Sequence, residues 1–394
     1  MKRAVLVLIC LAGCLTGDAS NDGDDGEGGP DDLGNEPAAT DLHNLNIGFN
    51  DGYIEQFGFY NDYFSATQQR GPRLCHAYVW WNVMSTAKDS GDPTDHMTRA
   101  FLDNWFRAAK GNCDEALISF KARNNAQPPT ADEYGTAFDK FAANDWQTET
   151  GFAGALSFTP WNEPNNPAGD GNGLGVQIPA RLAADYFMEA ERSCRKHGCK
   201  VAAGDFASNG NMWDSFRWQC SNDNVADGQL CKTHSAAYDA STPGPSYLDN
   251  YKNEIANHAT KYGLPAGYRP DYFAYHGWHD ANMYLKDGDH CTAYANCALR
   301  RILRSLGGSW GGVEIWDTED GAAQNDPTTD ENQACTAAFM LRLQAISSRV
   351  RRLYVTRLHG GAGGLINVDA MGNHVPRPAL GIFANRDRNA TNCR

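Results

Sequence analysis

The stretch Leu156-Ser-Phe-Thr-Pro-Trp-Asn-Glu-Pro-Asn165 joins an apolar run to an abrupt polar end. Its first residues read as a buried strand, and Asn162 and Glu163 follow where that strand should stop. In folds built from parallel strands and helices, functional sites form at the carboxyl ends of the strands. The stretch therefore predicts a strand that delivers an amide and a carboxyl group to a site beyond its end.

A second stretch, Gly312-Val-Glu-Ile-Trp-Asp-Thr-Glu-Asp-Gly321, repeats this form and places Glu319 at the end of another expected strand. Two strand-end carboxyl groups are what cleavage of a glycosidic bond requires, one as acid/base and one as nucleophile or base. Either glutamate could instead cap a helix or be a satisfied structural group. Asp317 and Asp320 are alternatives to Glu319, and strand alternation would turn Asp317 to the same side as Glu319.

Strand-like and helix-like segments alternate along the chain, which is typical of a parallel sheet with crossover helices. Eight strands are expected, at 45–49, 74–83, 116–120, 155–160, 200–205, 272–276, 313–316 and 352–358. The helical stripes between them lie at 97–110, from the capping box at 130–133 onward, and at 179–196, 247–262, 298–306 and 334–347. We therefore expect an α/β fold, a single (β/α)8 TIM barrel with disulfide-clipped loops.

The first residues indicate export. A basic start, Met1-Lys-Arg, precedes an apolar run that is too short to span a bilayer as a permanent helix. The run ends in Leu11-Ala-Gly-Cys14, which resembles a bacterial lipobox; an ordinary secretory signal cut nearby is the alternative. We expect residues 1–13 to be a signal peptide and Cys14 to carry lipid, anchoring the protein at the bacterial cell surface or in the periplasm. Leu15 rather than Asp follows the cysteine, so retention at an inner membrane is not expected.

The segment after Cys14 reads as a solvated tether. Residues 17–41 hold nine acidic residues and no Lys or Arg, a composition that cannot bury apolar surface. We expect residues 14–41 to form the lipidated tether and residues 42–394 to form one (β/α)8 domain. Of the chain's net charge of −14, half lies beyond residue 41. This acidic body argues against nucleic acid as a partner and against docking on an anionic bilayer.

Ten cysteines remain after Cys10 in the signal and Cys14, an even number that predicts five disulfides in an oxidising compartment. Short spacings suggest three local clips, Cys194–Cys199, Cys220–Cys231 and Cys291–Cys297. Elimination then leaves Cys75–Cys113 and Cys335–Cys393. Zinc is the competing use of these residues, but the sequence holds neither a CxxC pair nor an HExxH motif, and we expect no cofactor.

The two polar strand ends, Trp161-Asn-Glu-Pro164 and Thr318-Glu-Asp-Gly321, resemble the retaining glycoside hydrolases of clan A, in particular families 5 and 39. The likeness covers most of residues 42–382, although only these two motifs are specific. It implies Glu163 as acid/base, Asn162 as hydrogen-bond donor to the sugar 2-hydroxyl, and Glu319 as nucleophile. It also points to His276, because clan members often place His or Tyr beside the nucleophile.

The chain departs from the clan in two places. Many members carry an Arg at the end of the second strand, where Cys75-His76 stands here with Arg73 nearby. The Trp that usually follows the eighth strand is missing from Thr356-Arg-Leu-His-Gly360. Both departures leave the identity of the sugar open.

Aromatic residues at strand ends are expected in carbohydrate binding, because sugar C–H faces pack on aromatic rings. Candidates for substrate contact are Trp81, Trp278 and Trp316, although each could equally be a core residue. Tyr275-His-Gly-Trp-His-Asp280 crowds polar and aromatic groups into one expected loop, which could contact sugar or, through His276, His279 and Asp280, a metal. Asp205, at the end of the fifth strand, is a further candidate for a hydroxyl contact.

The leading hypothesis is a retaining glycosidase that acts outside the cytoplasm on a polysaccharide or glycoside, as a monomer whose partner is its carbohydrate substrate. Two alternatives remain, a glycan-binding surface lipoprotein whose catalysis has decayed and a transglycosylase that uses the same residues. Survival of both glutamates disfavours decay. Sequence does not separate transfer to a sugar from transfer to water.

Overall fold

The computed structural model describes residues 42, 44–50, 71–95, 98–122, 128–166, 177–208, 212, 246–289, 291, 297–321, 329–356 and 364–389. Within these residues eight parallel strands close into one barrel in the order in which they occur along the chain. The strands are β1 (Asn46–Asn50), β2 (Leu74–Trp80), β3 (Glu115–Lys121), β4 (Ala155–Thr159), β5 (Lys200–Ala207), β6 (Tyr272–His276), β7 (Glu314–Asp320) and β8 (Val350–Thr356). The expected eight-stranded barrel is confirmed.

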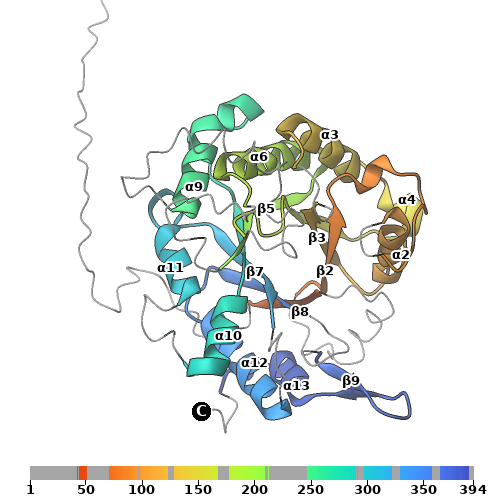
Figure 1. The fold of residues 1–394 in the computed structure, drawn as a ribbon, viewed down its shortest axis with the longest axis vertical. Helices are drawn as coiled ribbons and strands as arrows, with labels where there is room; N and C mark the ends of the chain where they lie inside the picture. The colour runs from red at the N-terminus through yellow and green to blue at the C-terminus, as the bar shows by residue number, and fades with distance from the viewer. Residues whose placement is uncertain are drawn as a thin grey trace, which may run out of the picture.

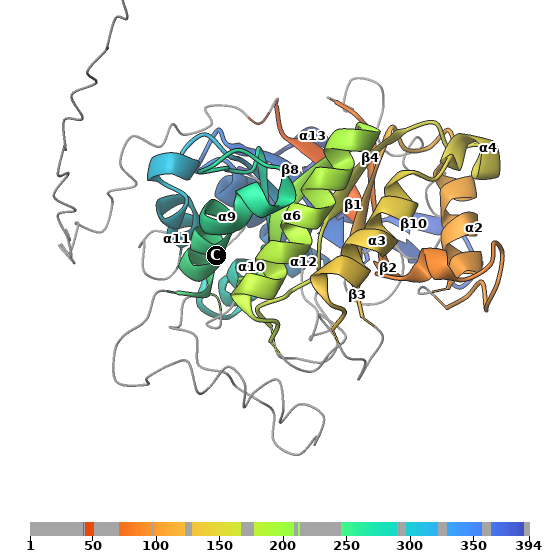
Figure 2. The same ribbon diagram turned by 90° about the horizontal axis from the view of Figure 1, so that it is seen from above.

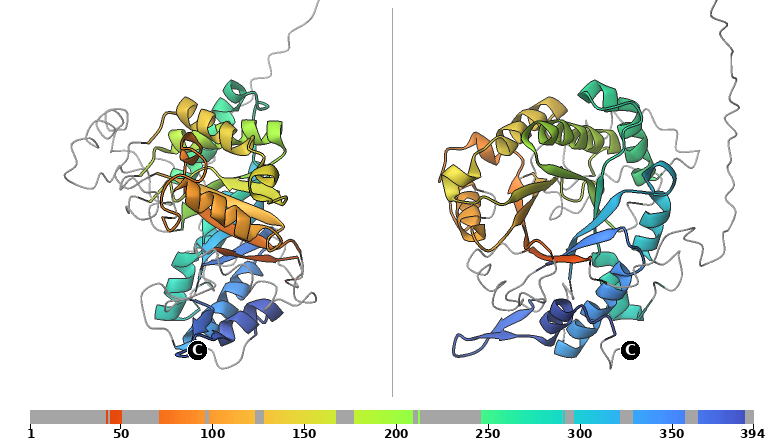
Figure 3. Two further views of the ribbon diagram at one scale, coloured as in Figure 1. Left: turned by 90° about the vertical axis from the view of Figure 1, so that its right-hand side faces the viewer. Right: turned by 180° about the vertical axis from the view of Figure 1, so that it is seen from behind.

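Helices surround the barrel on its outside (Figure 1; Figure 3, right). They are α2 (Arg99–Ala109), α3 (Ala131–Ala142), α4 (Trp146–Thr150), α6 (Ala180–His197), α9 (Tyr247–His258), α10 (Trp278–Asp287), α11 (Ala298–Ser305), α12 (Asp330–Gln344) and α13 (Pro378–Asn385). Short 3-10 turns are η2 (Val83–Ser85), η3 (Ala259–Tyr262) and η5 (Gly308–Trp310). Figure 2 shows α3 and α6 side by side across the outside of the sheet.

Local signals in the sequence set several helix ends. The Thr130 side chain accepts from the backbone of Glu133, whose carboxylate accepts in turn from Thr130, so the expected capping box opens α3. Gly198 ends α6 in the left-handed conformation, with φ of 77°. The sequence patterns did not predict three further features. These are α4, α13 and a hairpin of β9 (Ile366–Val368) and β10 (His374–Pro376), which projects from the barrel in Figure 1.

The amino end of the barrel interior is a packed layer. Trp316 is fully buried there, with the guanidinium carbon of Arg352 3.9 Å from its ring centroid and Tyr272 beside it. Arg352 in turn forms an ion pair with Glu115 from β3. We named Trp316 as a candidate substrate contact, but these contacts make it a core residue at the end of the barrel opposite the strand carboxyl ends. Strand alternation turned it inward, and its place early in β7 kept it far from the mouth.

Three of the expected disulfides are present, Cys75–Cys113, Cys194–Cys199 and Cys291–Cys297. Cys335 is also disulfide-bonded. Cys220, Cys231 and Cys393 lie outside the described residues, as does the whole segment 1–41 with Cys14. Among the helices that the structure describes, none has the length and apolar character needed to cross a membrane.

Candidate active site

Glu163 stands in the turn that follows β4. Its backbone takes a left-handed conformation, with φ of 44°, and its N–H donates to the carbonyl of Asp205 on β5 at 2.9 Å. The turn is held by Asn165, whose amide bonds both the N–H and the carbonyl of Ala207. A left-handed non-glycine residue is a strained conformation that persists only where its surroundings enforce it. Asn166 then donates to Oε2 of Glu163 at 2.7 Å, which fixes the carboxylate.

Glu319 is the second-last residue of β7. The register between β6 and β7 shifts after Tyr275, so that His276 stands opposite Glu319 rather than opposite Thr318. The hydroxyl of Tyr78, on β2, donates to Oε2 of Glu319 at 2.6 Å. Asn50, on β1, donates to the same hydroxyl at 2.8 Å. Glu319 is therefore oriented from the far side of the barrel.

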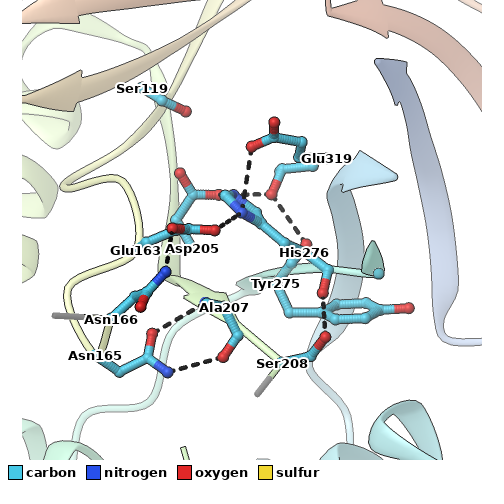
Figure 4. Close-up of polar contacts among 12 residues, drawn as sticks. Ser119, Glu163, Asn165, Asn166, Asp205, Ala207, Ser208, Tyr275, His276 and Glu319 are labelled. Atoms are coloured by element: carbon cyan, nitrogen blue, oxygen red, sulfur yellow. Dashed lines mark hydrogen bonds and ion pairs between the residues drawn. The ribbon is translucent and has the colours of Figure 1, made fainter. Parts of the chain in front are cut away.

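The imidazole of His276 lies between the two glutamates (Figure 4). Its Nδ1 is 2.9 Å from Oε1 of Glu163 and 3.3 Å from Oε2 of Glu319. Its Nε2 is 3.3 Å from Oδ1 of Asp205. One polar atom from each of Glu163, His276 and Glu319 lies within 4.8 Å of the other two. The side chains singled out after the fourth, sixth and seventh strands thus meet at one place, the carboxyl-terminal mouth of the barrel.

Asp205 is fully buried beneath this mouth, in a left-handed conformation with φ of 73°. Its carboxylate accepts from Thr318 at 2.5 Å and from Thr159 at 2.6 Å. Beyond Thr159 the chain of hydrogen bonds continues to Ser119 and His76. We expected Asp205 to contact a substrate hydroxyl, but its oxygens are occupied by these threonines. Its position suits it instead to orient His276.

The charges around His276 determine where protons reside. Burial by itself would lower the pKa of His276, but the negative charges of Glu319 and Asp205 outweigh it and hold that pKa well above its ordinary value. The ring is therefore an imidazolium at neutral pH. Burial and the nearby charge of Glu163 raise the pKa of Glu319, against the opposing effect of His276.

Glu163 is shifted in the opposite direction to Glu319. Burial would raise the pKa of Glu163, but the hydrogen bond and charge of His276 outweigh burial and lower it. The neighbouring Trp161 is turned away from the mouth and stacks on Tyr186, next to Tyr134. In the free protein Glu163 is consequently ionised, and the proton nearest to it resides on His276.

Asp317 and Asp320 do not share the mouth with Glu319. Asp317 accepts from Gln344 on α12 at 2.8 Å and from the backbone N–H of Gly277 at 3.0 Å. Both carboxyl groups are fully buried between the barrel and its helices. The expectation that strand alternation turns Asp317 to the side of Glu319 is wrong, because β7 departs from regular pairing with β8 between Asp317 and Asp320.

The remaining candidates lie around the mouth or behind it. Asn162 is almost fully buried after β4, where its N–H donates to the carbonyl of Phe120. Trp81 is half-buried just after β2. Trp278 opens α10, in the segment expected to be a loop, and its ring packs on Gly321, where an added side chain would begin 2.8 Å from it.

Two groups of potential metal ligands converge in the described part of the chain, and neither suits a metal ion. One consists of Asp280, Cys291 and Cys297, but these two cysteines are joined in a disulfide. Asp280 itself accepts from the N–H groups of Ala298 and Leu299 and thereby caps α11. The other group is Glu163, His276 and Glu319, where a protonated Nδ1 already stands between the carboxylates.

Sequence reasoning missed Tyr78, Asn166 and the threonines that hold Asp205. Tyr78 is separated from Glu319 by 241 positions, and Thr159 and Thr318 look like ordinary strand residues. The one available signal was Asn166, which stands three residues after Glu163 within the same polar turn.

No family model matches the sequence, and the comparison with curated proteins finds no match. Among solved structures, a conserved exported protein from Bacteroides fragilis matches with a TM-score of 0.51 at 13% identity, over 90% of this chain and 79% of the other. A GH5_18 from Bifidobacterium longum subsp. infantis matches with a TM-score of 0.52 at 13% identity, over 88% and 80%. The GH39 enzyme from Xanthomonas axonopodis pv. citri matches with a TM-score of 0.49 at 15% identity, over 89% and 67%. The chain thus has the (β/α)8 barrel fold of the first two structures, and the resemblance inferred from its motifs is confirmed at the level of the fold.

Proposed function

We propose that the protein is a retaining glycoside hydrolase, with Glu163 as acid/base and Glu319 as nucleophile. The observation that carries the proposal is the meeting of these two carboxyl groups, from β4 and β7, across the imidazole of His276 at the barrel mouth. Retaining enzymes hold their carboxyl groups about 5–5.5 Å apart, whereas inverting enzymes leave about 6.5–9.5 Å for a water molecule. An oxygen-to-oxygen approach within 4.8 Å favours the retaining class.

In the first step Glu319 attacks the anomeric carbon while the glycosidic bond breaks. The transition state carries positive charge on the sugar ring, which a carboxylate beneath it stabilises before the covalent bond forms. The hydrogen bond from Tyr78 leaves one carboxylate oxygen, Oε1, for the attack. Asn162, beside Glu163 on the same turn, is the candidate donor to the 2-hydroxyl.

The leaving oxygen requires a proton, and Glu163 is ionised in the free protein. His276 can supply this proton, because its Nδ1 lies 2.9 Å from Oε1 of Glu163. The transfer breaks the Nδ1–H bond and forms an O–H bond on Glu163, and the neutral ring keeps its Nε2 proton facing Asp205. The same transfer removes the cation beside Glu319, which makes that carboxylate a better nucleophile.

In the second step Glu163, ionised again after protonating the leaving group, acts as base. It takes a proton from a water molecule, whose oxygen attacks the anomeric carbon and displaces Glu319, and it then returns that proton to Nδ1 of His276. The first inversion is undone, so the product keeps the configuration of the substrate. Asn166 keeps the carboxylate of Glu163 in place through both steps by its 2.7 Å bond to Oε2.

We also propose that the protein works outside the cytoplasm, held by a lipid on Cys14. The disulfides among the described residues support this location, since disulfides persist in oxidising compartments. The acidic tether at 14–41 would separate the barrel from the membrane surface.

The test is a screen of the purified protein against polysaccharides and 4-nitrophenyl glycosides, with sizing of the products. NMR of the first-formed sugar then reads its configuration. Retention is expected, and inversion would overturn the assignment of Glu319 as nucleophile. Glycan binding without turnover in any substrate would instead favour the non-catalytic alternative.

A further inference from the structure

Behind the mouth, Asp317 and Asp320 form a pair of carboxyl groups that the proposed reaction does not use. Both side chains are fully buried, and neither forms an ion pair with Lys, Arg or His in the described part of the chain. Both Oδ2 atoms crowd against Gly277: a side chain there would begin 2.4 Å from that of Asp320 and 2.6 Å from that of Asp317. Gly277 therefore has to lack a side chain.

The hydrogen bonds around the pair leave a place for one proton. Asp317 accepts from Gly277 N–H, from Gln344 and from the hydroxyl of Tyr275, at 3.0, 2.8 and 3.2 Å. Asp320 accepts from Gly321 N–H through Oδ1, while its buried Oδ2 faces no donor. The Oδ2 atoms of Asp317 and Asp320 converge at Gly277, at 2.6 and 2.4 Å from the place where a side chain there would begin. Because ionised carboxylates only accept, a hydrogen bond between the two groups would need a proton, and Oδ2 of Asp320 is the oxygen that lacks a donor.

We propose that Asp317 and Asp320 share one proton and that this acid pair is the positioning device that holds His276 and Glu319 in register. The second half of the statement rests on the proposed function. Gly277, which follows His276, donates its N–H to the side chain of Asp317 and to the backbone carbonyl of Glu319. The pair thus ties the end of β6 to the end of β7 at the two residues that bear the chemistry.

Loss of the shared proton would place two like charges in a buried space. The groups that face the pair are Tyr275 and His276 from β6, Asp280 from α10 and the neutral Gln344 from α12. Of these, only His276 is cationic, and Asp280 adds a further negative charge. Burial is the main cause that raises the pKa of both groups, and the charge of Asp317 raises the pKa of Asp320 further. Stability from the pair is therefore fully present below the ordinary pKa of Asp and is lost as pH rises through the raised values.

A metal ion is the competing occupant of such a pair, and the surroundings oppose it. Asp317 is faced by two N–H donors and a hydroxyl, and an N–H dipole directs its positive end at the place a cation would take. A proton suits this arrangement, since it would provide a donor at Oδ2 of Asp320, the buried oxygen that faces none.

The decisive variant is Asp320→Asn. Its carbonyl oxygen can still accept from Gly321, and its amide can donate to Asp317 permanently, so the variant fixes the one-proton state. Asp103→Asn is the matched control, a fully buried aspartate on α2 that is ion-paired with Arg99. Tm is measured for wild type and both variants from pH 5 to pH 9. The Tm of Asp320→Asn should rise relative to wild type by roughly 3–6 °C across this range, and that of Asp103→Asn should not.

The positioning role is tested by measuring kcat as a function of pH with a 4-nitrophenyl glycoside that the protein hydrolyses. The assay temperature is well below Tm. Between pH 7 and pH 9, kcat should fall less in Asp320→Asn than in wild type, whereas a purely structural role would move Tm alone. If no glycoside is hydrolysed, the proposed function fails and the Tm comparison still decides whether the proton is shared.

Three results would overturn the shared proton. The first is a parallel pH dependence of Tm in wild type and Asp320→Asn. The second is a wild-type Tm that falls on addition of EDTA, which would reveal a metal ion. The third, which needs no variant to fold, is the absence from the wild-type infrared spectrum of a buried protonated-carboxyl band that is present at pH 6 and lost on alkalinisation.

Discussion

Tyr78, on β2, donates a 2.6 Å hydrogen bond across the barrel to Oε2 of Glu319, on β7. The two strands are not neighbours in the sheet, since β1 and β8 lie between them. The contact exists only because the barrel closes, and it leaves Glu319 with one oxygen held and one free. Asn50, on β1, one of the two intervening strands, donates a hydrogen bond to the hydroxyl of Tyr78.

Tyr78→Phe should lower kcat by about 10- to 150-fold with little change in KM, because it removes a hydrogen bond to a charged group that is worth about 1.5–3 kcal/mol. Steady-state kinetics with an activated aryl glycoside measure the effect. Tyr354→Phe is the control, since Tyr354 also faces the barrel interior but bonds Arg352 at the amino end. Equal losses in both variants would show that Tyr78 acts only through folding.

Glu319→Ala should abolish turnover, and azide should restore it with a product of inverted configuration, because the small anion takes the place of the missing carboxylate. The measurement is product formation with and without azide, followed by NMR of the product. Near-normal activity in the variant would remove Glu319 from the chemistry.

Glu163→Ala should spare the first step for substrates with activated leaving groups, which need no proton, and should slow the second step for want of a base. A burst of released 4-nitrophenol followed by slow turnover is the expected time course. A uniform loss with both good and poor leaving groups would contradict the acid/base assignment.

His276→Asn should move the acid limb of the profile of kcat/KM against pH to higher pH. That limb reports ionisation of the nucleophile, and the cation opposes the rise in the pKa of Glu319, so its removal lets burial raise that pKa further. His197→Asn is the control, because His197 pairs with Asp139 at the end of α6. An acid limb that stays in place would show that His276 carries no charge in the free protein.

Removing the disulfide Cys75–Cys113 by a double change to Ser should cost about 4 kcal/mol of unfolding free energy. The corresponding change at Cys194–Cys199 should cost about 2 kcal/mol, since the two loops span 38 and 5 positions and the longer loop constrains the unfolded chain more. Urea denaturation of both variants gives the comparison. A larger loss from the short loop would indicate that native contacts, not chain entropy, dominate.

Much of the barrel could be read from residue patterns. Periodicity and the caps at Thr130 and Gly198 placed the strands and several helices within a few positions, because these signals act between residues that are near in sequence. The strand ends also identified Glu163, His276 and Glu319, since the carboxyl ends of parallel strands meet at one edge. That these three side chains are in contact follows from the closure of the barrel.

Tertiary structure decided which polar residues face the mouth and which lie behind it. Irregular pairing at the end of β7 turned Glu319 to the mouth while Asp317 stayed outside the barrel against Gln344, and the early position of Trp316 in the same strand buried it under Arg352. A bulge changes the face of every residue near it and depends on both neighbouring strands, so local alternation cannot reveal it.

The barrel and the two strand-end glutamates could be inferred from residue patterns alone, because hydrophobic period and turn chemistry are properties of adjacent residues. Only the closed structure decided the charges of the site. The proton on His276 depends on Glu319 and Asp205, and the orientation of Glu319 depends on Tyr78, from strands that are distant along the chain. Electrostatic interactions act through space between buried groups. The order of those groups along the sequence does not show how far apart they lie in the folded protein.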